Sequence, residues 1–437
     1  MSMEKLNAMN GAPCPCGKDH RFTADVVVGE GAIQHIPQYI QKYSGTKVFV
    51  LSDKNTYAAA GEKVCAVLTR GGLPYSSYSF PEEHLEPDEK SVGSAVMHYD
   101  TACDLIVAVG SGVINDIGKI LSNLTGHPYI IVATAPSMDG YASSSSSMTR
   151  DGLKISLPSR SADVIIGDTD ILCQAPLHMM KAGLGDMLAK YVSICEWRLA
   201  QLITGEYYCQ EVAQLIRSAL KRCTDNAQGL LKREKAAVQA VFEGLVIGGV
   251  AMNYAGLSRP ASGVEHYISH VLDMRAVEFD TPMDLHGIQC AIGTRIAAGL
   301  YEKLHNITPD REKALAHAAA FDYAVHQKML RNLLGKGAES MITLEVKEGK
   351  YDLTAHATRL ETILTCWDTI LQIIQEEIPS AQTLDTLLDT IDAPKTLREI
   401  GTEESLLPDI FRATKDIRDK YVLSRLAWDL GIEEELL

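Results

Sequence analysis

Five short apolar runs in the first 170 residues constrain the fold of this chain more than any other feature. They are rich in Val and Ile and occupy residues 23–31, 46–53, 105–112, 129–135 and 162–169. Apolar runs this continuous are typical of strands in a parallel sheet that is covered on both faces. Helix-forming segments separate them, such as 55–72, which ends at two glycines. This alternation predicts an α/β fold with an open, doubly wound parallel sheet and ligands at the carboxyl ends of its strands.

The second half of the chain has a different character. From about His178 to Trp428 the sequence is almost wholly helix-forming and lacks strand-like runs. Residues 236–256 read as a buried helix with glycines that permit close packing, and 361–378 as an amphipathic one. Because 437 residues are too many for one compact core, we predict two domains. Residues 1–175 would form a dinucleotide-binding α/β domain, and residues 176–437 a helical domain that binds metal and substrate.

Composition excludes several classes of function. The net charge of −15 argues against a nucleic-acid partner, which requires a basic face. No run of about 18 apolar residues is present, so we expect no membrane insertion. The N-terminus lacks the apolar core of a signal peptide, and most of the ten cysteines stand singly in apolar surroundings, as reduced thiols do. We therefore expect a cytoplasmic protein.

One cysteine cluster stands near the N-terminus. Cys14, Cys16 and His20 in CPCGKDH could hold a zinc ion, but three donors within seven residues lack the usual second pair of ligands. The sequence alone favours a surface loop with adventitious metal affinity, and we leave the cluster out of the predicted site.

A glycine turn follows the run at 105–112 and opens a helical segment, in the sequence VAVGSGVINDIGK. Gly110 and Gly112 would let the backbone approach a pyrophosphate, whose charge is favourable at a helix N-terminus. Asn115 and Asp116 fall in the first turn of that helix. The turn lacks the G-x-G-x-x-G spacing, so a purely structural turn between strand and helix remains an alternative.

Two more strand ends carry polar side chains. Asp53 closes the run at 46–53, where its carboxylate can accept from a ribose or nicotinamide group, or cap the following helix. The segment TAPSMDGYASSSSS follows the run at 129–135 and offers the hydroxyls of Thr134, Ser137 and Ser143 and the carboxylate of Asp139. An ordinary polar loop has similar residues, and capping of the turn at Gly140 is the alternative for Asp139. The order of these elements, each after another strand, favours a nucleotide site.

Three residues of the second half suggest a metal site. Asp186, His266 and His286 lie in KAGLGDMLAKY, RPASGVEHYISH and MDLHGIQ, segments rich in small residues. One carboxylate and two imidazoles form a three-ligand divalent site with a position open for substrate. An open metal site beside a dinucleotide predicts metal-assisted hydride transfer. His270 follows His266 at the i, i+4 spacing of a helix face.

Taken in order, the glycine turn, TAPSMDG, GLGD, SGVEH and DLHG resemble the iron-containing alcohol dehydrogenase and dehydroquinate synthase superfamily. Within it, the motifs most resemble the bacterial glycerol-1-phosphate dehydrogenases, and more distantly the glycerol dehydrogenases. The resemblance covers the chain from about Ala24 to the final helices. It implies a nucleotide-binding α/β domain followed by a helical domain, which agrees with the pattern above.

The resemblance also implies roles for individual residues. Asp186, His266 and His286 would bind one divalent metal ion, which could be zinc, nickel or iron, and Asp186, His270 and Asp139 would be catalytic or contact the substrate. Contacts to NAD or NADP would come from Asp53, Gly112, Val113, Ile114, Asn115, Asp116, Thr134, Ala135, Pro136, Ser137 and Ser143. Two departures are informative: dehydroquinate synthases have a glutamate where this chain has Asp186, and butanol-type enzymes have a histidine where it has Lys190.

The implied reaction interconverts dihydroxyacetone phosphate and sn-glycerol 1-phosphate with NAD(P)H, in an enzyme expected to be a homodimer. The substrate is thus a small phosphorylated polyol or ketone, whose phosphate requires a cation, and Arg259 and Lys154 are the candidates from sequence. The alternatives are a glycerol dehydrogenase for unphosphorylated polyols, a dehydroquinate-synthase-like lyase and a non-catalytic nucleotide sensor.

Overall fold

The computed structural model describes residues 2–150 and 153–437, which form two compact units. Unit 1 comprises Met1–Met187 and Ser218–Gly256, and unit 2 comprises Leu188–Arg217 and Leu257–Leu437. The predicted domain division at 175/176 remains a prediction. The compact units group the segment Ser218–Gly256 with the N-terminal part of the chain.

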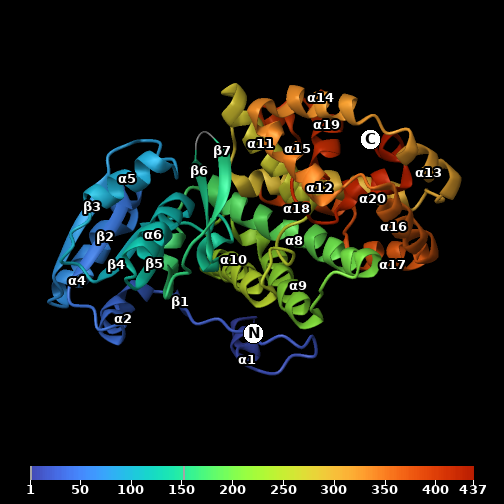
Figure 1. Ribbon diagram of the computed structural model, residues 1–437. Coiled ribbons are helices and arrows are strands. Elements are labelled where there is room, and N and C mark those ends of the chain that lie inside the picture. The colour runs from blue at the N-terminus through green and yellow to red at the C-terminus, as the bar shows by residue number, and fades with distance from the viewer. Residues whose placement is uncertain (1, 151–152) are drawn as a thin grey trace. The chain divides into compact units, whose positions relative to one another are not determined.

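Unit 1 is built on a six-stranded, wholly parallel sheet (Figure 1). Its strand order is β1-β8-β5-β4-β2-β3. The strands are β1 (Asp25–Gly29), β2 (Val48–Asp53), β3 (Tyr75–Phe80), β4 (Leu105–Gly110), β5 (Tyr129–Ala133) and β8 (Val164–Asp168). All five predicted runs are strands and the predicted α/β class is confirmed. Strand β3 was not predicted.

Both faces of this sheet are covered, as continuous apolar runs predict. Side chains alternate between the two faces of a strand, so Val48 and Val50 of β2 point one way and Phe49 the other. The face of Val48 packs on η1, α2, η2 and α4 in one buried cluster. Helices α5 and α6 pack on each other and α6 packs on β4, β5 and β2. These elements are η1 (Ala32–His35), α2 (Ile36–Lys42), α3 (Lys54–Thr56), η2 (Tyr57–Gly61), α4 (Glu62–Arg70), α5 (Glu89–Met97) and α6 (Gly112–Thr125).

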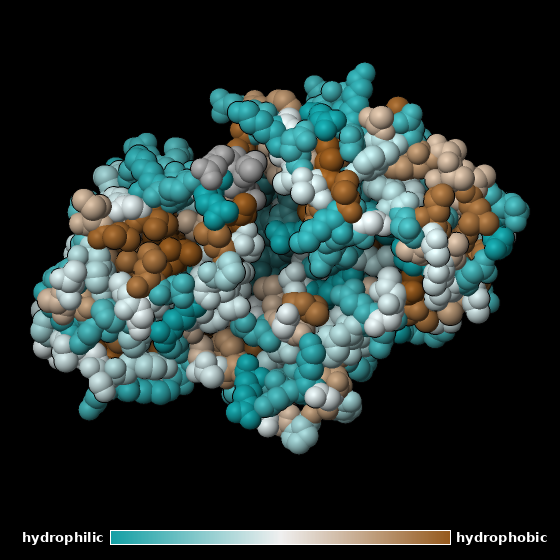
Figure 2. Space-filling model, in the orientation of Figure 1, coloured by the Kyte–Doolittle hydropathy of each residue, from teal (hydrophilic) through white to brown (hydrophobic). Residues whose placement is uncertain are grey.

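Exposed apolar side chains gather on the outer surface of α5 and α6. Val96, Met97 and Leu124 are 46%, 84% and 64% exposed, and a brown area covers these helices in Figure 2. This surface is the least polar part of unit 1 that solvent reaches in that view.

The remaining elements of unit 1 include an antiparallel hairpin that the sequence analysis did not predict. It consists of β6 (Ser145–Arg150) and β7 (Leu153–Pro158) and contains the serine run. The other elements are α1 (Ser2–Met9), η3 (Gly140–Ala142), α7 (Thr169–Leu172), η4 (Ala227–Gly229) and α10 (Lys235–Ala255). Helices α8 (Leu177–Thr204) and α9 (Gln210–Asp225) are each divided between the two units.

Helix α10 is, among the described residues, the one helix long and apolar enough to cross a membrane. In its most apolar stretch 78% of the residues are buried inside the protein. It packs on α1, α7, β1 and η3. This burial is typical of the core helix of a soluble protein.

Unit 2 is helical throughout the part that the structure describes, as predicted. Its helices α11 and α12 pack on each other, and α11 also contacts α14 and α19. One large apolar cluster joins nine of the described helices: α8, α11, α12, α13, α16, α17, α19, α20 and α21. Beyond α8 and α9 the helices are α11 (Val264–Phe279), α12 (His286–Leu304), α13 (Arg311–Ala319), α14 (Tyr323–Leu334), η5 (Gly335–Gly337), α15 (Ala338–Glu348), α16 (Leu353–Thr365), α17 (Trp367–Glu377), α18 (Ala381–Thr390), η6 (Arg398–Ile400), η7 (Glu404–Leu406), α19 (Leu407–Thr414), α20 (Leu423–Leu430) and α21 (Glu433–Leu436).

Candidate active site

The predicted glycine turn joins β4 to α6, and its two glycines differ. A Cβ at Gly110 would lie 2.4 Å from that of Ile114, so packing alone requires glycine there. A Cβ at Gly112 would meet only Met138, at 3.7 Å, an ordinary contact. The side chain of Ser111 does not cap α6. The first N–H groups of α6 are therefore not satisfied by a serine cap and can receive an anion.

The segment TAPSMDG lies beside this helix end. Thr134 N donates to Gly110 O at 3.0 Å, and the hydroxyls of Ser111 and Ser137 are 2.5 Å apart. The Tyr141 hydroxyl donates to Ala135 O at 2.6 Å. These bonds bring together the two segments that the sequence predicted as the nucleotide site.

Glycines on two helices allow this segment to pack closely. A Cβ at Gly183 of α8 would lie 1.8 Å from Pro136 O, and one at Gly249 of α10 would lie 2.7 Å from Asp139 O. Both distances are far below an ordinary contact, so only glycine fits at either position. Residues 136–142 are therefore held by their backbone against α8 and α10.

A buried lysine that the sequence analysis did not single out fixes the end of this segment. Lys119 is fully buried, and its Nζ donates to Gly140 O at 2.6 Å, Ser145 O at 3.0 Å and Ser143 Oγ at 3.1 Å. Burial lowers the pKa of Lys119. Asn115 Nδ2 also donates to Gly140 O, at 3.1 Å. The side chains of Asn115 and Ser143 thus position the loop, and their contact with the dinucleotide remains a prediction.

Asp53 takes the structural role that the sequence left open. It is the N-cap of α3: its Oδ1 accepts from Thr56 N at 2.8 Å, and Thr56 Oγ1 accepts from Asp53 N at 2.9 Å. This reciprocal pair explains an acidic residue at the end of β2 without a ligand. Contact of Asp53 with a dinucleotide remains a prediction.

Asp139 and Asp186 lie together, although 47 residues separate them. Asp186 is fully buried on α8, and its Oδ2 accepts from Asp139 N at 2.9 Å. The side chain of Asp139 makes no capping hydrogen bond to η3. The turn-capping alternative for Asp139 therefore lacks support, and the structure places it directly beside a predicted metal ligand.

In unit 2 the predicted histidines also lie together. The rings of His266 and His286 are 5.0 Å apart, and those of His270 and His286 are 6.2 Å apart. Cys290, one turn after His286 on α12, joins them: one donor atom each of His266, His286 and Cys290 lie within 4.8 Å of one another. The sequence gives no separate signal for Cys290, because an apolar context is typical of any buried thiol.

Hydrogen bonds orient both metal-type histidines. His266 Nδ1 lies 2.8 Å from Glu265 Oε1, and His286 Nδ1 lies 2.9 Å from Ser269 Oγ. The Ser269 hydroxyl donates to Gln289 Oε1, so it accepts from His286. Both rings thus carry their proton on Nδ1 and direct the lone pair of Nε2 outward, as in metal-bound histidines.

Behind these histidines lies a pair of buried carboxyl groups. Burial and then the neighbouring Glu265 raise the pKa of Glu196 to about 8. Burial likewise raises the pKa of Glu265 to about 7. Glu196 accepts from Val264 N and Leu423 N, and so fixes the start of α11, which carries His266.

Neither cation that the sequence suggested for a phosphate can be shown to be available for it, and a third cation lies near the start of α11. Arg259 is buried and paired with Glu206 through Nε at 2.8 Å and Nη2 at 2.5 Å, and the side chain of Lys154 lies outside the described residues. Lys420 is half-buried, and its Nζ donates to Ser262 O at 2.9 Å, beside the start of α11. Burial and then the nearby Arg259 lower the pKa of Lys420 to about 7.

Comparisons with known proteins identify the family to which the chain belongs. The family model for iron-containing alcohol dehydrogenases matches residues 27–176. A protein of Halalkalibacterium halodurans named glycerol-1-phosphate dehydrogenase, NAD(P)+, is 33% identical over 294 residues, covering 66% of this chain and 74% of that protein. One of the same name in Methanosarcina mazei is also 33% identical and covers 62% of this chain and 74% of its own length. This chain belongs to the glycerol-1-phosphate dehydrogenase family.

Solved structures show the same fold as this glycerol-1-phosphate dehydrogenase family member at lower identity. A 1,3-propanediol oxidoreductase matches with a TM-score of 0.62 and 16% identity, over 94% of this chain and 98% of that one. The glycerol dehydrogenase of Schizosaccharomyces pombe matches with a TM-score of 0.60 and 17% identity, over 96% and 91%. The fold predicted from the alternation of strands and helices is therefore that of the iron-containing alcohol dehydrogenases.

Proposed function

We propose that this chain is a metal-dependent sn-glycerol-1-phosphate dehydrogenase that interconverts dihydroxyacetone phosphate and sn-glycerol 1-phosphate with NAD(P)H. Membership of the family, shown by a relative of 33% identity with that name, carries the proposal. The oriented pair His266 and His286 supports it, because a dehydrogenase of this kind requires a divalent metal site.

We propose Asp186, His266 and His286 as the metal ligands. The donor set fits a divalent ion, since both imidazoles are held by Nδ1 and one carboxylate supplies the negative charge. Zinc and nickel suit these donors, as does iron, and the nearby thiol of Cys290 favours the softer ions. When bound, such an ion would act as a Lewis acid toward the substrate carbonyl while the nicotinamide supplies the hydride.

The start of α6 and the TAPSMDG segment would bind the dinucleotide. A Cβ at Gly112 would meet only Met138, at an ordinary contact distance of 3.7 Å, so room for a pyrophosphate remains beside the backbone. Ser137 is tied to this helix end through Ser111. Val113, Asp116 and the backbone of Thr134–Pro136 would complete the site. The preference between NAD and NADP is open.

The chain's own residues would orient the substrate and handle its proton. Asp139 is held by its backbone beside Asp186, so its carboxylate can accept from a substrate hydroxyl. His270 lies 6.2 Å from His286 between ring centroids and would relay the proton to the substrate oxygen. The contacts of Gly183, Gly249 and Lys119 with its loop keep Asp139 in place.

Lys420 would recognise the substrate phosphate. Burial and the nearby Arg259 destabilise the ammonium form of Lys420. A phosphate bound beside this lysine would stabilise the ammonium form and raise the pKa of Lys420 again. Arg259 itself is neutralised by Glu206. A phosphate-binding lysine is the feature that separates this function from that of a glycerol dehydrogenase acting on unphosphorylated polyols.

The decisive experiment is a steady-state comparison of dihydroxyacetone phosphate with dihydroxyacetone, each with NADH and NADPH and with zinc or nickel present. We expect kcat/KM for the phosphorylated ketone to be at least about 100-fold higher. Equal values would favour the glycerol dehydrogenase alternative. We further propose a cytoplasmic homodimer, which light scattering on the purified protein would test.

A further inference from the structure

The N-terminal segment before the sheet forms a closed loop in unit 1. Two hydrogen bonds between Asn10 and Phe22 join its ends: Asn10 Nδ2 donates to Phe22 O and Phe22 N donates to Asn10 Oδ1, both at 2.8 Å. Within the loop, Gly11 N donates to His20 O at 2.8 Å. The loop 10–22 is therefore a defined structure, although it contains neither helix nor strand.

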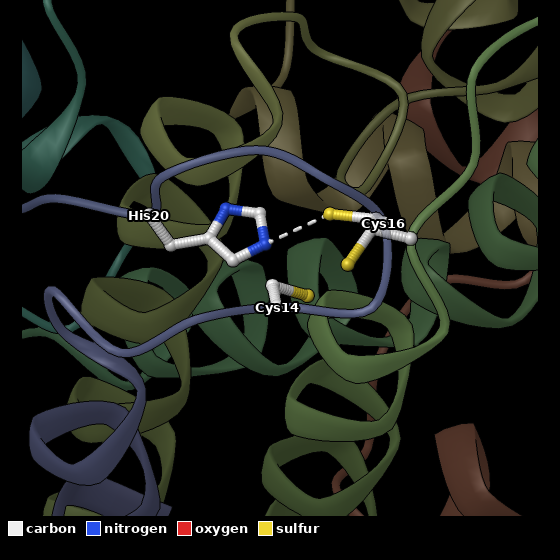
Figure 3. A group of neighbouring side chains, drawn as sticks. Cys14, Cys16 and His20 are labelled. Carbon is white, nitrogen blue, oxygen red and sulfur yellow. Dashed lines mark hydrogen bonds between the residues drawn. The ribbon is translucent and has the colours of Figure 1, made fainter.

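The loop turns Cys14, Cys16 and His20 toward one another (Figure 3). The two sulfur atoms and a ring nitrogen of His20 lie within 4.8 Å of one another. The distance from Cys16 Sγ to His20 Nε2 is 3.4 Å. With Zn–S and Zn–N bonds of about 2.3 and 2.05 Å, two ligands of a tetrahedral zinc ion are about 3.6 Å apart. The distance between Cys16 Sγ and His20 Nε2 is therefore close to that expected for two ligands of one zinc ion.

The imidazole of His20 is oriented as a metal ligand would be. The residue is 1% exposed, and its Nδ1 lies 3.0 Å from Tyr254 O at the end of α10. A backbone carbonyl accepts only, so the ring proton is on Nδ1 and the lone pair of Nε2 faces Cys16. Gly17 has φ of 79°, which allows the turn between the thiols and the histidine.

We propose that Cys14, Cys16 and His20 bind a structural zinc ion, separate in sequence and in ligand type from the catalytic metal site. Two thiolates and one imidazole are donors that zinc prefers. A further protein donor or a water molecule completes the tetrahedron. Binding releases the thiol protons and exchanges no electrons.

The proposed zinc ion would fasten the N-terminal segment to the end of α10. Lys18 Nζ donates to Ala255 O at 2.8 Å and the Tyr254 hydroxyl donates to Leu6 O at 3.2 Å. The same end of α10 holds the loop that carries Asp139, because Asn253 Nδ2 donates to Ala142 O at 2.6 Å. The zinc site would thus help to position the end of α10, which in turn contacts the loop that carries Asp139.

The test is a metal count on the full chain, expressed with zinc, kept reduced and free of any affinity tag. In His266→Ala, which lacks an active-site ligand, we expect about one zinc ion per chain to survive dialysis. Adding Cys14→Ser and Cys16→Ser should lower the count to near zero. Cobalt exchanged into His266→Ala should show thiolate-to-metal charge-transfer absorption, which the two cysteine changes should abolish.

Cys366→Ser, which alters another half-buried cysteine, is the matched control and should keep both the zinc and the absorption band. Hydrogen exchange of residues 10–22 and of the end of α10 should rise when Cys14 and Cys16 are replaced. If that variant does not fold, alkylation of the unaltered protein replaces it: zinc should protect both thiols and a chelator should expose them. Zinc retained without the two cysteines, a disulfide between them in the purified protein, or alkylation that is indifferent to zinc would each overturn the proposal.

Discussion

Replacing Gly183 by alanine tests whether the close approach of α8 to the TAPSMDG segment matters for function. In an ordinary helix interior this change is favourable, since alanine exceeds glycine in helix propensity by about 1 kcal/mol. Here the new Cβ would lie 1.8 Å from Pro136 O, where an ordinary contact begins at 3.4 Å. The loop or the helix must therefore move by about 1.6 Å.

The expected cost follows from that displacement. Overpacking of this kind costs about 1–3 kcal/mol, so the gain in propensity is cancelled or exceeded and the free energy of unfolding should fall by up to about 2 kcal/mol. The effect on catalysis should be larger, because a misplacement of about 1 Å at a site costs roughly 100-fold in rate. We expect kcat/KM to fall by about that factor while the far-UV spectrum is unchanged.

Gly299→Ala is the matched control, since it changes a helical glycine of α12 whose added Cβ would meet no atom within 4 Å. This variant should be as active as the parent and slightly more stable. The assays are urea unfolding, NADH titration and steady-state kinetics on both variants. If Gly183→Ala is as active as Gly299→Ala, the close approach does not position the site and the reasoning is wrong.

Four further predictions follow from the site. His266→Ala should fold normally but lose its active-site metal and turnover, and chelation of the parent should have the same effect, reversed by a divalent ion; full active-site occupancy with retained activity would refute the ligand assignment. Gly112→Val should weaken the dissociation constant for the dinucleotide at least tenfold, or about 1.4 kcal/mol, by filling the space beside α6; an unchanged constant would place the cofactor elsewhere. Lys420→Met should raise KM for dihydroxyacetone phosphate at least about tenfold and leave KM for dihydroxyacetone unchanged. Because the pKa of Lys420 is lowered to about 7, the lysine loses its charge between pH 6 and 8, and KM of the parent enzyme for dihydroxyacetone phosphate should rise over that range. Glu196 has a folded pKa raised to about 8 and so keeps a proton that the unfolded chain releases, which means stability should fall from pH 5 to 8; Glu196→Gln should flatten this fall in urea unfolding, and an unaltered slope would exclude that carboxyl as its source.

The strands could be predicted where burial on both faces leaves a continuous apolar run. Strand β3 was missed because it lies at the edge of the sheet, where half-exposed Ser and Tyr alternate in YSSYSF. The hairpin β6–β7 was missed because a serine run has low strand propensity. Contacts from elsewhere support it: Lys119 donates to Ser145 O, and Ser146 Oγ donates to Asp116 O at 3.2 Å.

The residue types at the candidate site were readable, but their partners were not. Ser269 orients the ring of His286 from 17 residues away, and its hydroxyl is held by Gln289, 20 residues from Ser269; no local spacing marks Ser269. The same holds for Cys14, Cys16 and His20. Their motif lacks a second ligand pair, and the carbonyl that fixes the proton of His20 on Nδ1 belongs to Tyr254, 234 residues away.

The loop that carries Asp139 shows why small residues marked this site in the sequence. Two helices reach its backbone directly, through Gly183 at Pro136 O and Gly249 at Asp139 O, and Asp186 accepts from the N–H between them. Contacts to the carbonyl and N–H groups of a loop do not depend on the side chains at those positions. The side chain of Asp139 can therefore be specialised for a ligand without loss of the backbone contacts that hold the loop. In the sequence, Gly183 of GLGD and Gly249 of GGVAM mark these backbone contacts. Replacing either glycine should affect catalysis more than replacing most polar residues of the loop.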